Sequence, residues 1–262
     1  MKKFLFAFVF SFFLVNAYSQ ESDSPFSLDL KSDCIIGISG LTLNGTTFLC
    51  DNILELNRNS FDGNILDKND VNSFDRFFMN PYSDSLNMGA NILLGLGIIT
   101  PCILLTEPKE EWLTLGVMYA ETLLLANGCK ELGKFAVNRA RPYMYFDGYP
   151  LEKVEDGDWE KSWPSGHTTF AFASAAFLSY TYYKYNPDSK WNYLVTGGSF
   201  LLAGTTGALR VASGNHFATD VLTGALIGTA CGLFVPWFHT INTNEKIQAQ
   251  ILPAGLAISI RF

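Results

Sequence analysis

Residues 86–106 read LNMGANILLGLGIITPCILLT, a stretch of twenty-one residues without a single charge. A helix needs about 20 mostly apolar residues to cross a bilayer, with a range of roughly 17–25. Four further apolar runs follow along the chain, and together they carry one charge, Glu121: Trp112–Cys129, Thr168–Tyr183, Trp191–Leu209 and Val221–Phe238. The pattern predicts an all-α fold, a membrane-embedded helical bundle of five to six helices.

Composition supports a membrane protein and argues against one class of partner. Charged residues make up 16% of the 262 residues, against roughly 25% in an average soluble protein. The formal net charge of −7 excludes nucleic acid as an expected partner, because binding to a phosphate backbone needs a basic surface. A soluble all-α protein with very apolar core helices is the alternative, but so many uncharged runs are hard to cover in so short a chain. Glycines in Gly95–Gly97 and at Gly197 and Gly198 are expected to let helices approach closely.

The first nineteen residues are typical of a secretory signal. Lys2 and Lys3 precede the apolar stretch Phe4–Val15, and Ala17-Tyr18-Ser19 fits a small-x-small cleavage site. The alternative is an uncleaved anchor helix, and the start resembles a bacterial export signal. We therefore divide the chain into residues 1–19 as signal or anchor, 20–85 as a polar segment with one short apolar helix, 86–240 as the helical-bundle domain and 241–262 as a tail.

The five cysteines show no metal-ligand spacing. Three of them lie in apolar runs and are expected to be small core residues. Cys34 and Cys50 flank one short segment, and a disulfide between them is a further possibility outside the cytoplasm.

Lys134 and Arg141 bring two cations to the end of the second apolar run. They are seven residues apart, and seven steps on an α-helix bring a side chain back to within about 20° of the first. We therefore expect both cations to point the same way, with Pro142 ending the helix at Arg141. A basic helix end at a membrane interface is the ordinary alternative.

The segment Pro164-Ser165-Gly166-His167 stands at the start of the third run. Ser165 is a favourable N-cap, and the first free N–H groups of a helix bind anions. Gly166 allows close approach of a ligand to the backbone, and His167 adds a titratable group. An ordinary helix cap beside an interfacial histidine is the alternative.

His216 and Asp220 are four residues apart and are expected on one helical face. A carboxylate on one imidazole nitrogen fixes the tautomer and leaves the other nitrogen free to attack. Arg210 lies upstream of them, across the Ser213-Gly214 turn. Taken alone, such a pair is more often structural than catalytic.

The order of runs and motifs predicts that these groups meet. The cations follow the second run, Ser-Gly-His precedes the third, Arg210 follows the fourth, and His216 and Asp220 precede the fifth. If every run crosses the bilayer, all four positions fall on the same membrane face. The sequence therefore predicts one assembled anion site at one membrane face.

The three motifs together resemble those of the type 2 phosphatidic acid phosphatases, which share a fold with bacterial non-specific acid phosphatases and vanadium haloperoxidases. The family pattern is Lys-x6-Arg-Pro, Pro-Ser-Gly-His and Ser-Arg-x5-His-x3-Asp, in this order. The chain matches it from Lys134 to Asp220, except that Leu209 stands where serine is usual.

The resemblance implies a role for each matched residue. His216 would attack phosphorus to form a phosphohistidine, Asp220 would orient it, and His167 would protonate the leaving group and later activate water. The phosphoryl oxygens would be held by the phosphate-binding groups, which are Lys134, Arg141, Arg210, Ser165 and the Gly166 amide. The resemblance implies no metal or cofactor. Leu209 should at most weaken phosphate binding.

Three remaining features complete the expectations. Glu121 lies about 20 Å from Lys134 along a helix, so we expect it to have a hydrogen-bonded structural role. His239 is expected to cap the last run at the interface. The aromatic, acidic loop Tyr143–Trp163 is expected to cover the site, with a plain surface loop as the alternative.

These observations favour an integral membrane phosphatase acting on a lipid phosphate or diphosphate, such as an isoprenoid diphosphate, a phosphatidate-type lipid or lipid A. The alternatives are a soluble secreted acid phosphatase, a vanadate-dependent haloperoxidase and a non-enzymatic phospholipid-binding protein. Polar residues make it doubtful that Cys34–Cys50 crosses the membrane. If it does not, the site faces the periplasm, which is the side we expect for a bacterial cell-membrane protein; if it crosses after signal cleavage, the site faces the cytoplasm. An uncleaved anchor with a non-crossing Cys34–Cys50 also places the site outside.

Overall fold

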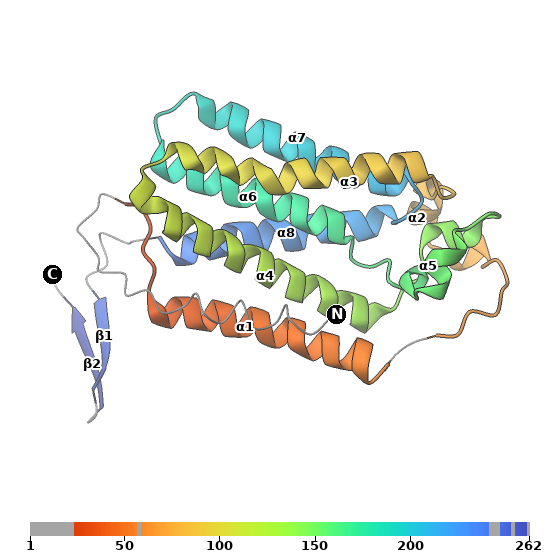
Figure 1. Cartoon of the computed structure of the whole chain (residues 1–262), viewed down its shortest axis with the longest axis horizontal. Helices are drawn as coiled ribbons and strands as arrows, with labels where there is room; N and C mark the ends of the chain where they lie inside the picture. Colours follow the sequence, from red (N-terminus) through yellow and green to blue (C-terminus); the bar gives the residue numbers. More distant parts are fainter. Residues whose placement is uncertain (1–23, 57–58, 241–246, 253–254, 261–262) are drawn as a thin grey trace, which may run out of the picture.

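Long helices lie side by side along the length of the molecule (Figure 1). The computed structural model describes residues 24–56, 59–240, 247–252 and 255–260, so the expected signal segment lies outside the described residues. The prediction of an all-α membrane bundle is confirmed. The long helices are α1 (Leu30–Phe48), α3 (Asp84–Ile99), α4 (Trp112–Val137), α6 (Gly166–Tyr185), α7 (Trp191–Ala212) and α8 (Ala218–Phe238).

Short elements fill the connections at the two ends of the bundle. The α-helical ones are α2 (Ser73–Phe78) and α5 (Leu151–Glu155), both at the same end in Figure 1. A two-stranded antiparallel hairpin, β1 (Ile247–Leu252) and β2 (Gly255–Ile260), follows the bundle, with Ile247 opposite Ile260. The remaining short helical turns are η2 (Leu49–Ile53), η3 (Lys68–Asp70), η4 (Thr100–Thr106), η5 (Lys109–Glu111), η6 (Pro142–Tyr145) and η7 (Asp158–Glu160).

Helix α6 is the centre of the bundle, because it contacts α3, α4, α7 and α8. Its buried face is built from small residues, including Ala171, Ala173, Ala175 and Ala176, each at most 1% exposed. Small side chains allow membrane helices to pack with their backbones close together. The central position of α6 therefore follows from its alanine-rich sequence.

Three glycines of α8 make the closest helix contact of the bundle. A Cβ atom added at Gly228 would lie 2.2 Å from the carbonyl oxygen of Thr169 on α6. Gly224 and Gly232, one turn away on either side, are equally restricted, with carbonyl oxygens of α6 at 2.6 Å and 2.4 Å. Glycine at every fourth position thus lets α8 lie directly on the backbone of α6.

The glycines that the sequence singled out do not have this role. Gly95, Gly197 and Gly198 have no atom within 4 Å of an added Cβ, and only Gly97 approaches a neighbour, at 3.9 Å from Ala171. That part of the prediction was wrong. Glycines close together in sequence point in different directions around a helix, so at most one of them can face a given neighbouring helix.

Helix α1 differs from the expectation of a short, non-crossing segment. The stretch Leu30–Ile53 is long and apolar enough to cross a membrane, as are Asp84–Thr106 and Ala218–Phe238. Its polar residues are satisfied within helices: Asn44 Nδ2 donates to the carbonyl oxygens of Gly40, at 2.7 Å, and of Leu124, at 3.0 Å. Polar groups bonded in this way cost little inside a bilayer, so they do not prevent this segment from crossing.

The path of α1 from one end of the bundle to the other also rules out the considered disulfide. The Ser27 amide donates to the His239 carbonyl oxygen (3.1 Å) at one end, and Asp51 pairs with Lys161 at the other. Cys34 and Cys50 are both free, and sixteen helical residues separate them by about 24 Å. The Cys34–Cys50 disulfide is therefore wrong.

Candidate active site

The predicted site residues come from four segments that meet at one end of the bundle. These segments are the end of α4, the start of α6, the end of α7 and the start of α8 (Figure 1). Backbone bonds join them: the Ser165 amide donates to the Asp220 carbonyl oxygen at 3.0 Å, and the Tyr143 amide to that of Gly214 at 3.1 Å. The order of apolar runs and motifs thus correctly predicts that these four segments lie at the same end of the bundle.

His216 lies fully inside this end of the protein, 2% exposed. It precedes α8 instead of belonging to it, so the expected helical pairing with Asp220 is not observed. Its Nδ1 lies 2.7 Å from the Ser162 carbonyl oxygen. Because a carbonyl oxygen only accepts, Nδ1 carries the proton and Nε2 carries the lone pair. Burial and the positive charges of Arg141 and Arg210 hold the pKa of His216 well below its usual value.

Asp220 is held by three donors, none of which is His216. Its carboxylate accepts from Ser162 Oγ at 2.5 Å, from the Phe217 amide at 2.8 Å and from Arg139 at 2.6 Å. The distance to His216 Nδ1 is 3.7 Å, which is too long for a hydrogen bond. Asp220 therefore acts on the imidazole indirectly, by fixing Ser162, whose carbonyl oxygen orients the ring.

Arg141 reaches the site from an extended segment, not from a helix. Helix α4 ends at Val137, and Asn138 follows with a left-handed φ of 45°. The expectation that Lys134 and Arg141 share a helical face was therefore wrong, although both cations are at the predicted end. Arg141 Nη1 donates to His216 Nε2 at 3.1 Å and to the Asn215 carbonyl oxygen at 2.8 Å.

Asp158 fixes the other side of the Arg141 guanidinium. Its carboxylate accepts from Nη2 at 2.6 Å, and its carbonyl oxygen accepts from Nε at 2.8 Å. Lys153 Nζ lies 3.5 Å from the same carboxylate. Burial alone would raise the pKa of Asp158, but the charges of Arg141 and Lys153 outweigh it and lower the pKa to about 2. Arg141 is thus held rigidly beside the lone pair of His216.

Arg210 and Lys134 supply further positive charge to the site. Arg210 is 3% exposed and donates through Nη1 to Asn87 Oδ1. Its Nε is buried and has no hydrogen-bond partner among the described residues. Lys134, in the last turn of α4, brings a further cation to the same end. A buried, unpaired guanidinium N–H is costly unless an anion accepts from it.

Ser165 and Gly166 begin α6, as the sequence predicts. Ser165 is the N-cap residue, yet its side chain makes no capping bond, and its Oγ accepts from Thr168 Oγ1 at 2.9 Å. The first amides of α6 therefore carry no side-chain cap. An added Cβ at Gly166 would lie 2.9 Å from Cδ of Lys130, so this glycine makes room for a lysine side chain.

His167 is oriented by a residue that the sequence argument missed. Its Nε2 lies 2.6 Å from Oδ1 of Asn91 on α3. The amide oxygen only accepts, so Nε2 carries a proton and Nδ1 remains available. Asn91 and Asn87, the partner of Arg210, are four residues apart on one face of α3. That spacing of two amides in an uncharged run is the signal by which they could have been found.

Arg139 and Asp75 form a second network that sequence reasoning missed. Arg139 bridges the carboxylates of Asp220, at 2.6 Å, and Asp75, at 2.7 Å. Asp75 on α2 also accepts from the Thr219 amide at 3.0 Å and from its Oγ1 at 2.6 Å. Although burial opposes it, the bonds from Arg139 and Thr219 hold the pKa of Asp75 below its usual value. The network ties α2 to the start of α8.

The loop Tyr143–Trp163 lies over this end of the bundle. Tyr143 and Met144 are 0% exposed, and Trp159 is 8% exposed. Leu209, in place of the usual serine, packs towards α3, where a Cβ at Gly89 would lie 3.5 Å from its Cδ1. Tyr143, Met144 and Trp159 of the loop pack together and form a small core above the site.

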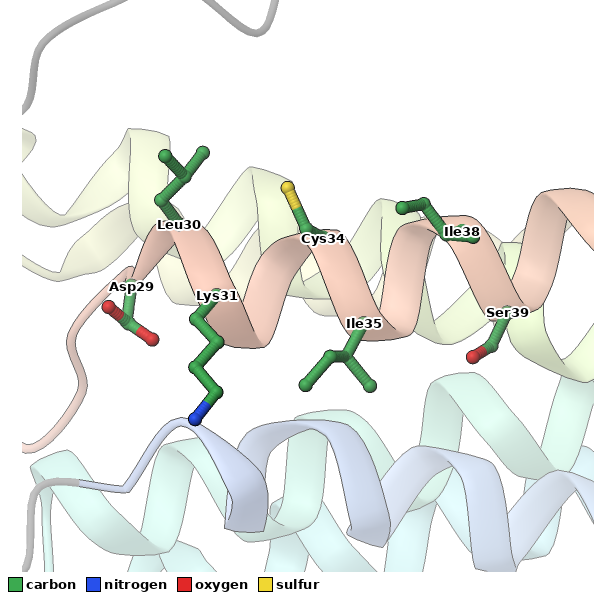
Figure 2. A pocket seen from close by; sticks show the side chains of 7 residues that line it. All are labelled: Asp29, Leu30, Lys31, Cys34, Ile35, Ile38 and Ser39. Atoms are coloured by element: carbon green, nitrogen blue, oxygen red, sulfur yellow. The ribbon is translucent and has the colours of Figure 1, made fainter. Parts of the chain in front are cut away.

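A cavity of about 760 Å³ lies elsewhere, along the first turns of α1 (Figure 2). It is lined by the N-cap Asp29 and by side chains of the first turns of α1: Leu30, Lys31, Cys34, Ile35, Ile38 and Ser39. It opens on the outer, apolar side of α1 and contains none of the groups described above.

Known proteins resemble this chain over the region that contains the three motifs. A family model described as "PAP2 superfamily" matches residues 115–244. The lipid A 1-phosphatase of Porphyromonas gingivalis is 33% identical over 133 residues, which is 51% of this chain and 26% of that protein. The bacitracin transport permease protein BcrC of Bacillus licheniformis is 30% identical over 170 residues, which is 62% of this chain and 76% of that protein.

Two solved structures resemble the bundle. LpxE of Aquifex aeolicus is 24% identical with a TM-score of 0.44, over 62% of this chain and 91% of that one. A transmembrane PAP2-type phosphatidylglycerolphosphate phosphatase from Bacillus subtilis is 20% identical with a TM-score of 0.48, over 80% and 96%. The sequence comparisons settle the relationship that the motifs indicated: this chain belongs to the PAP2 superfamily.

Proposed function

We propose that this protein is a phosphatase that hydrolyses a lipid phosphate or diphosphate through a phosphohistidine on His216. One observation carries the proposal: the lone pair of the buried His216 Nε2 lies 3.1 Å from the Arg141 guanidinium. A neutral imidazole among cations is a nucleophile placed where a phosphoryl group would bind. The unpaired Nε of Arg210 supplies a further donor for such an anion.

In the first step, the Nε2 lone pair forms the N–P bond while the bond from phosphorus to the lipid oxygen breaks. The proton stays on Nδ1, which donates a hydrogen bond to the Ser162 carbonyl oxygen. This hydrogen bond stabilises the ring as it becomes positive. The leaving oxygen takes a proton from Nδ1 of His167, and the ring takes up this second proton when the negatively charged phosphate binds beside it. Asn91 holds the Nε2–H of His167, so Nδ1 is the atom that exchanges protons with the substrate.

In the second step, water attacks phosphorus and the N–P bond breaks. His167 accepts the proton of the attacking water, and inorganic phosphate leaves with His216 restored. Charge on the phosphoryl oxygens is stabilised by Lys134, Arg141, Arg210 and the free amides at the start of α6. These groups are fixed before substrate binds, and Asp158 and Asn87 hold the two arginines.

Exposed phenylalanines beside the site favour a lipid substrate. Phe74, Phe77 and Phe78 on α2 are 50%, 81% and 42% exposed. Asp75 of the same helix is bound to Arg139 and Thr219, so this apolar surface is attached to the site. Two relatives have names that agree with a lipid substrate: a lipid A 1-phosphatase and a probable diacylglycerol pyrophosphate phosphatase 1 of Schizosaccharomyces pombe.

A phosphate-release screen of purified protein tests the proposal. Phosphatidate, diacylglycerol pyrophosphate, an isoprenoid diphosphate and lipid A are compared with soluble phosphate esters, with and without EDTA. We expect release from at least one lipid, unaffected by EDTA during the assay and abolished in His216→Ala. Release that persists in His216→Ala, or confined to soluble esters, would contradict the proposal.

We further propose that the site faces the periplasm of a bacterial cell membrane. Because α1 runs between the two ends of the bundle, the site lies opposite Asp29, which must then be cytoplasmic. This orientation requires that residues 1–19 stay attached without crossing the bilayer, and the twelve residues of Phe4–Val15 are fewer than a spanning helix needs. A removed signal would reverse the orientation.

Labelling of single cysteines in intact cells decides the side. The cysteines are first replaced by serine or alanine, and one is then introduced at exposed Asn64, near the site, or at exposed Asp188, at the opposite end. We expect a membrane-impermeant maleimide to label the protein at position 64 and not at position 188. The reverse pattern, with a mature N-terminus near residue 20, would refute the periplasmic orientation.

A further inference from the structure

Three titratable side chains meet at the end of the bundle opposite the phosphate site. They are Asp33 in the first turn of α1, Glu121 on α4 and His239 directly after α8. Their ligand atoms all lie within 4.8 Å of one another. Glu121 thus has a hydrogen-bonding partner, as expected. His239 is the C-cap residue of α8, as expected, and its side chain is buried.

The three side chains are largely removed from solvent. The exposed fractions are 0% for the His239 side chain, 4% for Glu121 and 13% for Asp33. His239 Nε2 lies 2.9 Å from Glu121 Oε2 and 3.6 Å from Asp33 Oδ1. Two carboxylates buried together repel each other unless a positive charge lies between them.

The tautomer of His239 shows which of its nitrogens faces the carboxylates. Its Nδ1 lies 3.1 Å from the Ser27 carbonyl oxygen, which only accepts, so Nδ1 carries a proton. The lone pair of a neutral ring is then on Nε2 and points at two carboxylates. A backbone carbonyl that fixes the outer N–H is also the usual arrangement of a metal-binding histidine.

Two unsatisfied atoms distinguish a metal ion from a proton. Glu121 Oε1 and Asp33 Oδ1 are buried and have no hydrogen-bond partner among the described residues. A proton on His239 Nε2 would serve Glu121 Oε2 and leave both of them unpaired. A divalent cation between the three groups would take ligands from all of them and balance two negative charges.

We propose that Asp33, Glu121 and His239 form a divalent-metal site of the zinc type. One imidazole nitrogen and two carboxylate oxygens suit Zn²⁺, with its fourth position left to water. Bonds of about 2.1 Å in a tetrahedral site place ligand atoms about 3.4 Å apart, close to the spacings of 2.9 Å and 3.6 Å around Nε2. Small side-chain movements complete the coordination.

The site joins three helices and takes no part in phosphoryl transfer. Glu121 is thirteen residues before Lys134, about 20 Å along α4. The ion would fasten the start of α1 to α4 and to the end of α8. Its role is therefore to stabilise the bundle, and the proposal is independent of the proposed reaction.

Metal content and thermal stability of the full-length protein test the site. Protein purified in detergent from zinc-supplemented cells is analysed by inductively coupled plasma mass spectrometry. We expect about one zinc per wild-type chain and less than one fifth of that in Glu121→Gln and His239→Gln. Glu110→Gln is the matched control, since it removes one exposed carboxylate at the same end and should keep the metal.

The wild-type protein alone also decides the matter, whether or not the variants fold. Zn²⁺ added to EDTA-treated protein should raise the Tm by several degrees. The inference is overturned if wild-type protein contains no stoichiometric divalent metal and its Tm does not respond to Zn²⁺, Mn²⁺ or Mg²⁺. Phosphate release is measured separately, so either proposal can fail without the other.

Discussion

Nδ1 of His216 lies 2.7 Å from the backbone carbonyl oxygen of Ser162, so the main chain orients the imidazole. The Asp220 carboxylate, 3.7 Å from the same nitrogen, influences the ring through the 2.5 Å bond from Ser162 Oγ. Asp220 also holds Arg139 and the Phe217 amide. The aspartate therefore positions the Ser162 segment that supports the His216 ring, and does not contact the ring itself.

Ser162→Ala should lower kcat by about tenfold to a hundredfold with little change in KM. The substitution removes one bond to a buried carboxylate, worth about 1.5–3 kcal/mol, and leaves the substrate contacts in place. Steady-state kinetics of the variant measure the effect, with Ser39→Ala, an exposed site on α1, as the control. Wild-type kcat in Ser162→Ala would contradict the indirect role of Asp220.

His216 should stay neutral as the pH falls through 6.5, where an ordinary histidine takes up a proton. Burial and the charges of Arg141 and Arg210 lower its pKa well below 6.5, and a lowered pKa keeps the imidazole uncharged until the pH falls through it. The chain has 3 histidines, so ¹⁵N-labelled rings can be followed by NMR and assigned with His216→Gln. A midpoint near 6.5 for the His216 signal would show that the predicted environment is wrong.

Gly228→Ala should lower the free energy of unfolding by about 1–3 kcal/mol, because the added methyl group would overlap the Thr169 carbonyl oxygen. Gly204→Ala on α7 is the matched control, since nothing lies within 4 Å of its added Cβ. Thermal unfolding in detergent compares the two. We expect a lower Tm for Gly228→Ala only; equal Tm values would argue against the backbone contact between α6 and α8.

Phe77→Ala should reduce turnover of lipid substrates more than turnover of p-nitrophenyl phosphate. Phe77 is 81% exposed and lies on α2, outside the phosphate-binding groups, so only substrates with acyl or prenyl chains should lose contacts. The ratio of kcat/KM values for the two substrates is the measurement. Phe238→Ala, at the far end of α8, serves as control, and an unchanged ratio in Phe77→Ala would remove the support for lipid binding by α2.

Long uncharged runs and ordered motifs predicted the bundle and the end at which the site forms. Hydrophobicity over about 20 residues is a strong signal, and alternating crossings place Lys134, His167, Arg210 and His216 together. Helix geometry near the site was less predictable. Asn138 adopts a left-handed conformation and ends α4 early, so the periodicity between Lys134 and Arg141 did not apply.

Supporting residues were missed because their partners are distant in sequence. Asn91 and Asn87 carry no charge, and their roles come from contacts with His167 and Arg210 on other helices. Arg139 is two residues from Arg141 but turns towards Asp75, 64 positions away. The doubt about crossing by α1 arose for the same reason, since the sequence does not show that Asn44 is satisfied by a carbonyl oxygen of α4.

Capture of the phosphoryl-enzyme tests the central claim most directly. His167→Ala lacks the group that activates water, and p-nitrophenyl phosphate has a leaving group that needs no acid, so the intermediate should accumulate. Rapid mixing should give a burst of about one nitrophenol per chain and an acid-labile phosphate on the peptide that contains His216. Turnover without a burst and without label, or label on another residue, would contradict nucleophilic attack by His216.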